Sequence, residues 1–118
     1  MTKQQQTSIN DLTINLEWKG SLSIEHARGL HQDLLEAFTK HQTIYLDLSN
    51  VTDMDSSIIQ LICAAIKEAP TQKKAFHLTG TLQTLLQTKL KRYGFIMKET
   101  SIAEELEKQW SMQNQGSL

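Results

Sequence analysis

Two serines preceded by two aspartates form the segment of this chain with the clearest potential for chemistry. Asp53 and Asp55 lead into Ser56 and Ser57, and the residues that follow have the spacing of an amphipathic helix. The first N–H groups of a helix have no partner within it, and the helix dipole stabilises negative charge there. A serine hydroxyl at this position is therefore a candidate phosphate acceptor, because the phosphate would meet those donors. The segment is a candidate charge switch.

Structural roles are the alternative for each of these four side chains. Ser57 can satisfy an unpaired N–H of the helix, and Ser56 is the stronger candidate for the helix cap. Turn formation and capping explain Asp53 and Asp55 better than a metal site or an acid–base pair does. The sequence alone does not separate the two serines.

Hydrophobic periodicity predicts the elements that hold this segment. Apolar residues alternate over 12–16, and Lys19-Gly20 predicts a turn before a short partner strand that contains Leu22 and Ile24. Spacings of three and four predict four helices, within 27–38, 58–69, 82–90 and 102–110. Denser apolar runs predict further strands at 44–48, 75–78 and 95–97. Alternating strands and helices are typical of an α/β layer with right-handed crossovers.

Local signals predict where some of these elements begin and end. Pro70 is expected to end the helix that follows the serines. Thr81 is a candidate N-cap for the next helix, and Gly94 suits its C-terminal end. Residues 1–10 and 113–118 are predicted to be flexible tails, so that 11–112 form a single domain.

Composition limits the classes of partner that need to be considered. The chain of 118 residues has a formal net charge of -1 and no long basic run, which argues against nucleic acid. No apolar stretch approaches the roughly 20 residues that span a bilayer, so we expect no direct membrane insertion. The first ten residues lack the apolar core of a secretory signal, and a cytoplasmic location is expected.

The remaining chemically versatile side chains form no recognisable catalytic set. The four histidines, His26, His31, His41 and His77, show no metal-ligand spacing. The lone Cys63 lies in an apolar segment and is expected to be a core residue. No glycine-rich phosphate loop is present. We therefore expect no metal, no cofactor and no enzymatic activity.

The segment around the serines resembles the STAS domain, a family that includes the bacterial anti-sigma factor antagonists. The resemblance is sharpest at Leu46-Asp47-Leu48-Ser49 followed by Asp55-Ser56-Ser57, and it extends over residues 12–110. It implies an α/β fold with a STAS-like mixed β-sheet of about four to five strands and about four α-helices packed on it.

In the antagonists the motif reads Asp-Ser-Ser-Gly, and its second serine, which corresponds to Ser57, is the phosphorylation site. Ile58 replaces the glycine here, and a bulky β-branched side chain is expected beside the acceptor. The resemblance implies a binding module that docks on an anti-sigma factor or serine kinase of GHKL type and is released by phosphorylation at Ser57. The expected contact residues are Asp53, Asp55, Ser56, Ser57, Ile58, Gln60 and Leu61.

Two other roles fit the same resemblance. The chain could serve as an unphosphorylated STAS adaptor in a chemotaxis or two-component signalling assembly. It could also be the regulatory STAS subunit of an ABC transporter for membrane lipids, where it would act on the ATPase subunit. The sequence does not name the partner or fix the oligomeric state.

Overall fold

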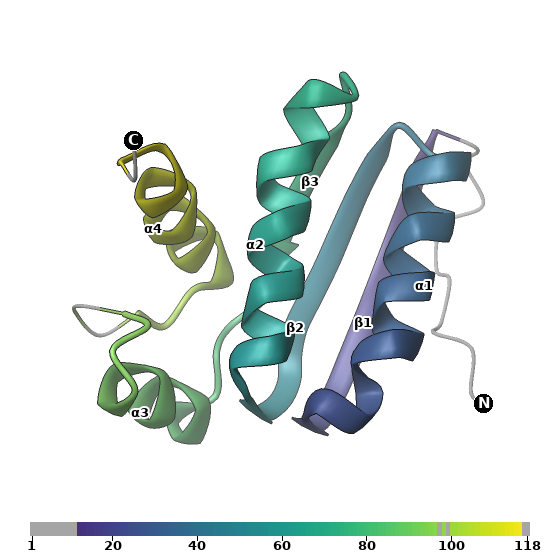
Figure 1. The fold of residues 1–118 in the computed structure, drawn as a ribbon. Helices are drawn as coiled ribbons and strands as arrows, with labels where there is room; N and C mark the ends of the chain where they lie inside the picture. The colour runs from purple at the N-terminus through teal and green to yellow at the C-terminus, as the bar shows by residue number, and fades with distance from the viewer. Residues whose placement is uncertain (1–11, 97, 99, 117–118) are drawn as a thin grey trace.

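The computed structural model describes residues 12–96, 98 and 100–116, with side chains described as far as residue 112. Four helices and three strands follow one another along this part of the chain (Figure 1). Their bounds are β1 Thr13–Leu22, α1 Ile24–Lys40, β2 Thr43–Met54, α2 Ser56–Thr71, β3 Ala75–Thr79, α3 Thr84–Arg92 and α4 Ala103–Gly116.

The three strands form a parallel sheet in the order β1-β2-β3, with β2 at its centre. The four helices and the α/β class agree with the sequence prediction. Among the residues that the structure describes, however, the sheet has three strands and both pairings are parallel. The expected mixed sheet of four to five strands is therefore not confirmed.

The predicted turn at Lys19-Gly20 is wrong, because β1 continues through it as far as Leu22. The pairing register with β2 shifts on either side of this dipeptide, and Gly20 has a φ of 85°. A glycine in this conformation accommodates a bulge within a strand as readily as a turn between two strands. Ile24, expected in a partner strand, is instead the first residue of α1.

The predicted strand at 95–97 is not observed either. Phe95 and Ile96 belong to no strand, and residue 97 lies outside the described part of the chain. Phe95 N–H instead donates to Leu90 O at 2.8 Å, and Gly94 N–H donates to Lys91 O at 3.1 Å. These two bonds form a Schellman motif at the end of α3, with Gly94 at a φ of 85° as the sequence predicts.

Other predicted boundaries shift by a few residues. Pro70 lies inside α2, which ends at Thr71. Thr81 pairs with Ile102 in an isolated antiparallel bridge, and the N-cap of α3 is Gln83. Since α4 continues to Gly116, it extends beyond residue 113, where a flexible tail was expected to begin. The other expected tail, at residues 1–10, lies outside the described residues.

Helices α1 and α2 lie side by side across one face of the sheet (Figure 1). The strands alternate buried and less buried residues, and in β2 the side chains of Ile44, Leu46 and Leu48 are fully buried. Ile58 and Ile62 of α2 are also fully buried and belong to the same core. The dense apolar run of β2 thus reflects its central place in a parallel sheet beneath two helices.

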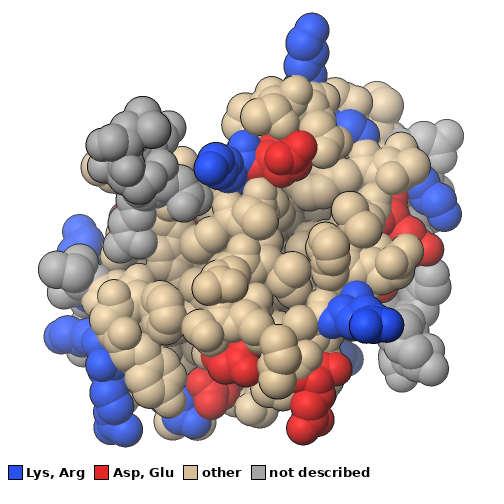
Figure 2. Space-filling view, in the orientation of Figure 1, with Lys and Arg blue, Asp and Glu red and all other residues tan. Residues whose placement is uncertain are grey.

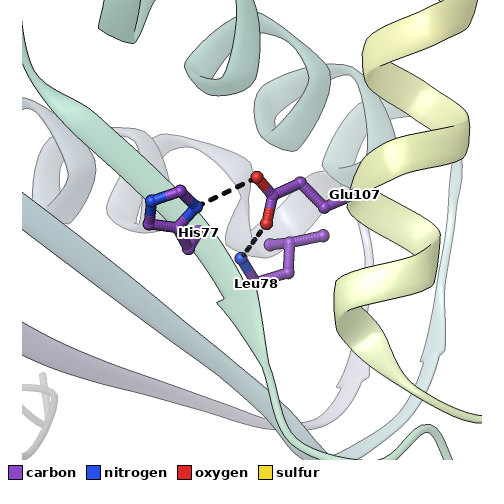
Figure 3. Close-up of polar contacts among 3 residues, drawn as sticks. All are labelled: His77, Leu78 and Glu107. Atoms are coloured by element: carbon purple, nitrogen blue, oxygen red, sulfur yellow. Dashed lines mark hydrogen bonds and ion pairs between the residues drawn. The ribbon is translucent and has the colours of Figure 1, made fainter.

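Helix α4 covers the outer edge of β3 through one glutamate (Figure 3). Glu107 Oε1 accepts the Leu78 N–H of the edge strand at 2.9 Å, and Glu107 Oε2 lies 3.1 Å from His77 Nδ1. Nearby, Trp110 is almost completely buried and donates from Nε1 to Phe95 O at 2.9 Å. The carboxylate satisfies a backbone donor that an edge strand would otherwise leave unpaired.

Candidate functional site

The candidate site lies where two helices begin, at the carboxyl ends of β1 and β2. Parallel strands end at the same edge of a sheet, so the helices that follow them start next to each other. Leu22 and Met54 are register partners at the ends of these strands. The Asp55 N–H then donates to Leu22 O at 3.1 Å, which brings the first turns of α1 and α2 together.

Asp55 is the N-cap of α2, as one of the two structural alternatives predicts. Its backbone is extended, and Oδ1 accepts the N–H groups of Ser57 at 3.0 Å and Ile58 at 3.3 Å. The Ser57 hydroxyl donates to the same oxygen at 2.5 Å. An aspartate at this position satisfies helix donors that have no partner within the helix, and its charge favours the positive end of the dipole.

The second oxygen of the same carboxylate belongs to a different helix. Asp55 Oδ2 accepts the N–H of Ile24, the first residue of α1, at 2.9 Å. The side chain of Ile24 is 66% exposed beside this bond. Sequence reasoning missed Ile24, because its spacing from Leu22 is also that of a strand. The parallel pairing of β1 with β2 is what brings it to the site.

Hydrogen bonding lowers the pKa of Asp55. The largest cause is the bond from the Ser57 hydroxyl, opposed by desolvation, and the N–H groups of Ile58, Ile24 and Ser57 lower the pKa further. All four donors favour the charged form of the carboxyl group. The site thus holds a carboxylate at neutral pH, surrounded by donors from both helices.

The two serines occupy different environments in the first turn of α2. Ser56 is exposed and is the first helical residue, so it is not the N-cap that the sequence favoured. Ser57 is half-buried and its hydroxyl is directed to Asp55. The two serines, which the sequence could not distinguish, thus differ in exposure and in their contact with Asp55.

Asp53 takes part in an ion pair rather than a helix cap or a turn. It lies within β2, and its Oδ2 is 3.0 Å from Lys89 Nζ of α3. Its Oδ1 is buried, with no hydrogen-bond partner among the described residues. Lys89 and Asp53 are 36 residues apart in the sequence, and only the fold brings them together.

The remaining expected contact residues of α2 divide between core and surface. Ile58 is fully buried, which removes it from the surface and corrects the expectation of a bulky side chain beside the acceptor. Gln60 is exposed one turn after Ser56. Leu61 is half-buried and lines a groove of about 340 Å³ between α1 and α2, together with Leu35 of α1. Figure 2 shows that the centre of this face has few charged side chains.

Of the other candidate groups, His26 lies in the first turn of α1, where its Nδ1 accepts the Ser23 N–H at 3.0 Å, and Cys63 lies further along α2. Burial raises the pKa of the Cys63 thiol to about 11, so the thiol is protonated at neutral pH. Within the described residues, no three His, Cys, Asp or Glu side chains are grouped so that they could hold a metal ion. No helix in that same part of the chain is long and apolar enough to cross a membrane.

Comparisons with known proteins agree with this architecture. The family model described as "Mlab, STAS domain" matches residues 5–95. The fold is similar to that of the anti-sigma factor antagonist SpoIIAA in its unphosphorylated form, with a TM-score of 0.59 and 18% identity over 78% of this chain and 84% of that one. SpoIIAA of Bacillus in its phosphorylated form gives a TM-score of 0.59 and 17% identity over the same shares.

A third solved structure has a similar fold. It is a proposed anti-sigma factor antagonist of Thermotoga maritima, with a TM-score of 0.58 and 21% identity over 76% of this chain and 77% of that one. A search of curated protein sequences finds no match. The structural likenesses, at these identities, establish the fold, and the family model covers most of the sequence. This chain belongs to the STAS domain family.

Proposed function

We propose that this chain is a regulatory protein-binding module of the anti-sigma factor antagonist type, switched by phosphorylation of Ser57. The observation that carries the proposal is the position of the Ser57 hydroxyl, in the first turn of α2 and 2.5 Å from Asp55 Oδ1. The partner is an anti-sigma factor or a serine kinase of GHKL type. In this role the chain binds other proteins and catalyses no reaction of its own.

The local geometry is compatible with transfer of a phosphoryl group from ATP to Ser57. In that reaction the Oγ–P bond forms, the bond from the γ-phosphorus to the bridging oxygen breaks, and ADP leaves. The hydroxyl proton passes to a base of the kinase. Ile58 does not obstruct the approach, because its side chain lies in the core. The first turn of a helix also tolerates a phosphate, so the fold of the modified chain is expected to persist.

Electrostatics explains why the modified chain would lose its partner. A phosphate adds about -1.5 to -2 charges at pH 7 and replaces a hydroxyl that now donates a hydrogen bond to Asp55. Within an interface, the phosphate and the neighbouring Asp55 carboxylate must be desolvated side by side, which is unfavourable. The unmodified surface presents Ser56, Gln60 and Ile24, and a partner can bind it without desolvating a phosphate.

The test is phosphorylation of the purified chain by the GHKL-type kinase encoded nearest to it. The intact mass is measured after incubation with ATP, for the wild type, Ser57→Ala and the matched control Ser56→Ala. We expect one added phosphate in the wild type and Ser56→Ala and none in Ser57→Ala. Calorimetry should then show kinase affinity at least about tenfold weaker after modification.

Other outcomes would support the competing roles. Tight binding to the kinase without any phosphate transfer would contradict the switch for that pair and favour a constitutive signalling adaptor. Co-purification of the chain with the ATPase subunit of a lipid transporter, indifferent to Ser57→Ala, would favour the transporter role. Phosphate transfer that persists in Ser57→Ala but disappears in Ser56→Ala would move the modification to Ser56.

A further inference from the structure

We propose that Asp55 positions the first turn of α1 according to the state of the Ser57 hydroxyl. One carboxylate holds both helices, because Oδ1 accepts from Ser57 and Ile58 while Oδ2 accepts from Ile24. The two oxygens are parts of one rigid group, so a rotation that improves the fit at one oxygen disturbs the other. Asp55 is thus a positioning residue that connects two positions more than 30 residues apart in the sequence.

The Ile24 bond is the contact that a change at Ser57 would affect. The three hydrogen bonds between Ser23 and His26, at 2.8, 3.0 and 3.5 Å, stay within the first turn of α1. The Ile24 N–H instead reaches across to the first turn of α2. When that bond weakens, the Asp55 N–H to Leu22 O bond still joins the two segments. The first turn of α1 then loses its side-chain attachment to α2 and can shift without unfolding either helix.

Modification of Ser57 would act directly on this carboxylate. The unmodified hydroxyl donates to Oδ1 and supplies the largest of the interactions that favour the charged form. A phosphorylated serine has lost that donor and carries like charge, so it repels Asp55. The carboxylate must then turn away from Ser57, and the bond to Ile24 is strained or lost.

The consequence is a change in shape as well as in charge at the proposed docking surface. Ile24 is the exposed apolar side chain of this surface, next to the helix end that carries Ser56 and Ser57. A partner that packs on Ile24 would therefore sense the state of Ser57 without contacting it. This use of the coupling rests on the proposed function, whereas the coupling itself is a property of the isolated chain.

Nuclear magnetic resonance of the purified chain tests the coupling in the absence of any kinase. The amide proton shift of Ile24 is followed from pH 7 to pH 2.5, together with the carboxyl carbon of Asp55. The other titratable groups at this end are Glu25 and His26 of α1, Asp53 of β2 and Lys89 of α3. Glu25 adjoins Ile24 in the chain and His26 bonds to Ser23 beside it, so the titrations are carried out in a Glu25→Gln, His26→Gln background. Glutamine at position 26 can also complete a capping box with Ser23.

The expected result is that Ile24 and Asp55 titrate with one midpoint. Asp55→Asn should abolish the titration at Ile24, and Ser57→Ala should move the midpoint of both nuclei to higher pH. Ser57→Asp should move it further in the same direction, because it adds a like charge. The matched control, Ser56→Ala, should leave the midpoint unchanged.

Two results would overturn the proposal. One is an Ile24 amide that does not titrate with Asp55. The other is a midpoint that is the same in the parent chain and Ser57→Ala, or that moves equally in Ser56→Ala. Because no partner or ATP is used, these results are distinguishable from a failure of phosphorylation. Absence of phosphate transfer with intact coupling would contradict only the proposed function.

Discussion

Two carboxylates in this molecule each connect two elements by accepting a backbone N–H, yet they differ in how easily that hydrogen bond can be broken. Asp55 joins α2 to α1 through the N–H of Ile24, and Glu107 joins α4 to the edge of β3 through the N–H of Leu78. Each also accepts from or contacts a side chain, the Ser57 hydroxyl in one case and the His77 imidazole in the other.

The difference lies in burial and in the chemistry of the side-chain partner. Leu78 is almost fully buried, so its N–H has little access to water if Glu107 is removed. The first turn of α1, in contrast, is solvent-accessible, and its donor can bond to water instead. A hydrogen bond contributes most to stability where its N–H donor has no other acceptor if the bond breaks. A bond that must break during switching is best placed where water can replace the lost acceptor. Glu107 is therefore the better placed of the two for stability, and Asp55 for the switching that we propose.

The largest effect on stability should come from a change in the core packing beneath the Asp55 site, which holds the start of α2 in place. Ile58→Ala removes a fully buried side chain and should lower the free energy of unfolding by about 2–5 kcal/mol. Ile24→Ala is the matched control at the start of the other helix, and its exposed side chain should contribute less than about 0.5 kcal/mol. Urea denaturation measures the free energy of unfolding of both variants. Equal losses in Ile58→Ala and Ile24→Ala would contradict the view that the start of α2 is fixed by buried packing while the start of α1 is not.

Glu107→Ala should give the next largest effect, because it leaves the Leu78 N–H without its acceptor. A buried donor that loses its partner costs about 1–3 kcal/mol. Glu107→Gln retains an acceptor oxygen and should lose less. Glu104→Ala, an exposed change on the same helix, should stay within about 0.5 kcal/mol. If Glu107→Ala were as mild as Glu104→Ala in urea denaturation, the stabilising role of this attachment would be wrong.

Asp55→Ala should be less destabilising than Glu107→Ala. Loss of an N-cap costs about 0.5–2 kcal/mol, and the Ile24 N–H that is released can bond to water. Asp55→Asn should recover most of this loss, since asparagine caps helices about as well as aspartate. A loss of stability in Asp55→Ala well above that in Glu107→Ala, in thermal and urea denaturation, would contradict this difference between the two carboxylates.

The sequence predicts the elements better than it predicts their contacts. The periodicity around α2 identified the helix, the serine pair and the alternative of an aspartate cap, because all of these depend on neighbouring residues. Lys19-Gly20 was ambiguous, since a glycine at positive φ serves a bulge within β1 as well as a turn. The same ambiguity placed Ile24 in a strand.

Contacts between distant segments carry no local signal, and the site depends on two of them. The bond of Asp55 to Ile24 requires the parallel register of β1 with β2. The pair of Asp53 with Lys89 requires α3 to pack beside β2. The expectation of a bulky Ile58 side chain beside the acceptor failed because adjacent residues of a helix point in different directions, and Ile58 points into the core.

The smallest predicted effect is a pH dependence that separates the two serines. The pKa of Asp55 is lowered in the folded chain, chiefly by the Ser57 hydroxyl. A carboxyl group of this kind adds stability above its unfolded pKa, near 3.9, and that stability is lost as the pH falls through the folded value. Ser57→Ala raises the folded pKa of Asp55 towards its ordinary value, so the variant should be slightly less stable than the wild type at pH 6–7.

This difference in stability should shrink below about pH 4, as urea denaturation at pH 7 and pH 3 can measure. Ser56→Ala should show no such dependence, because its hydroxyl has no part in lowering the pKa of Asp55. A Ser57→Ala difference that is the same at both pH values would mean that the hydroxyl does not act through the charge of Asp55. The hydrogen bond of Asp55 to Ile24 would then be as independent of Ser57 as the bond of Glu107 to Leu78 is.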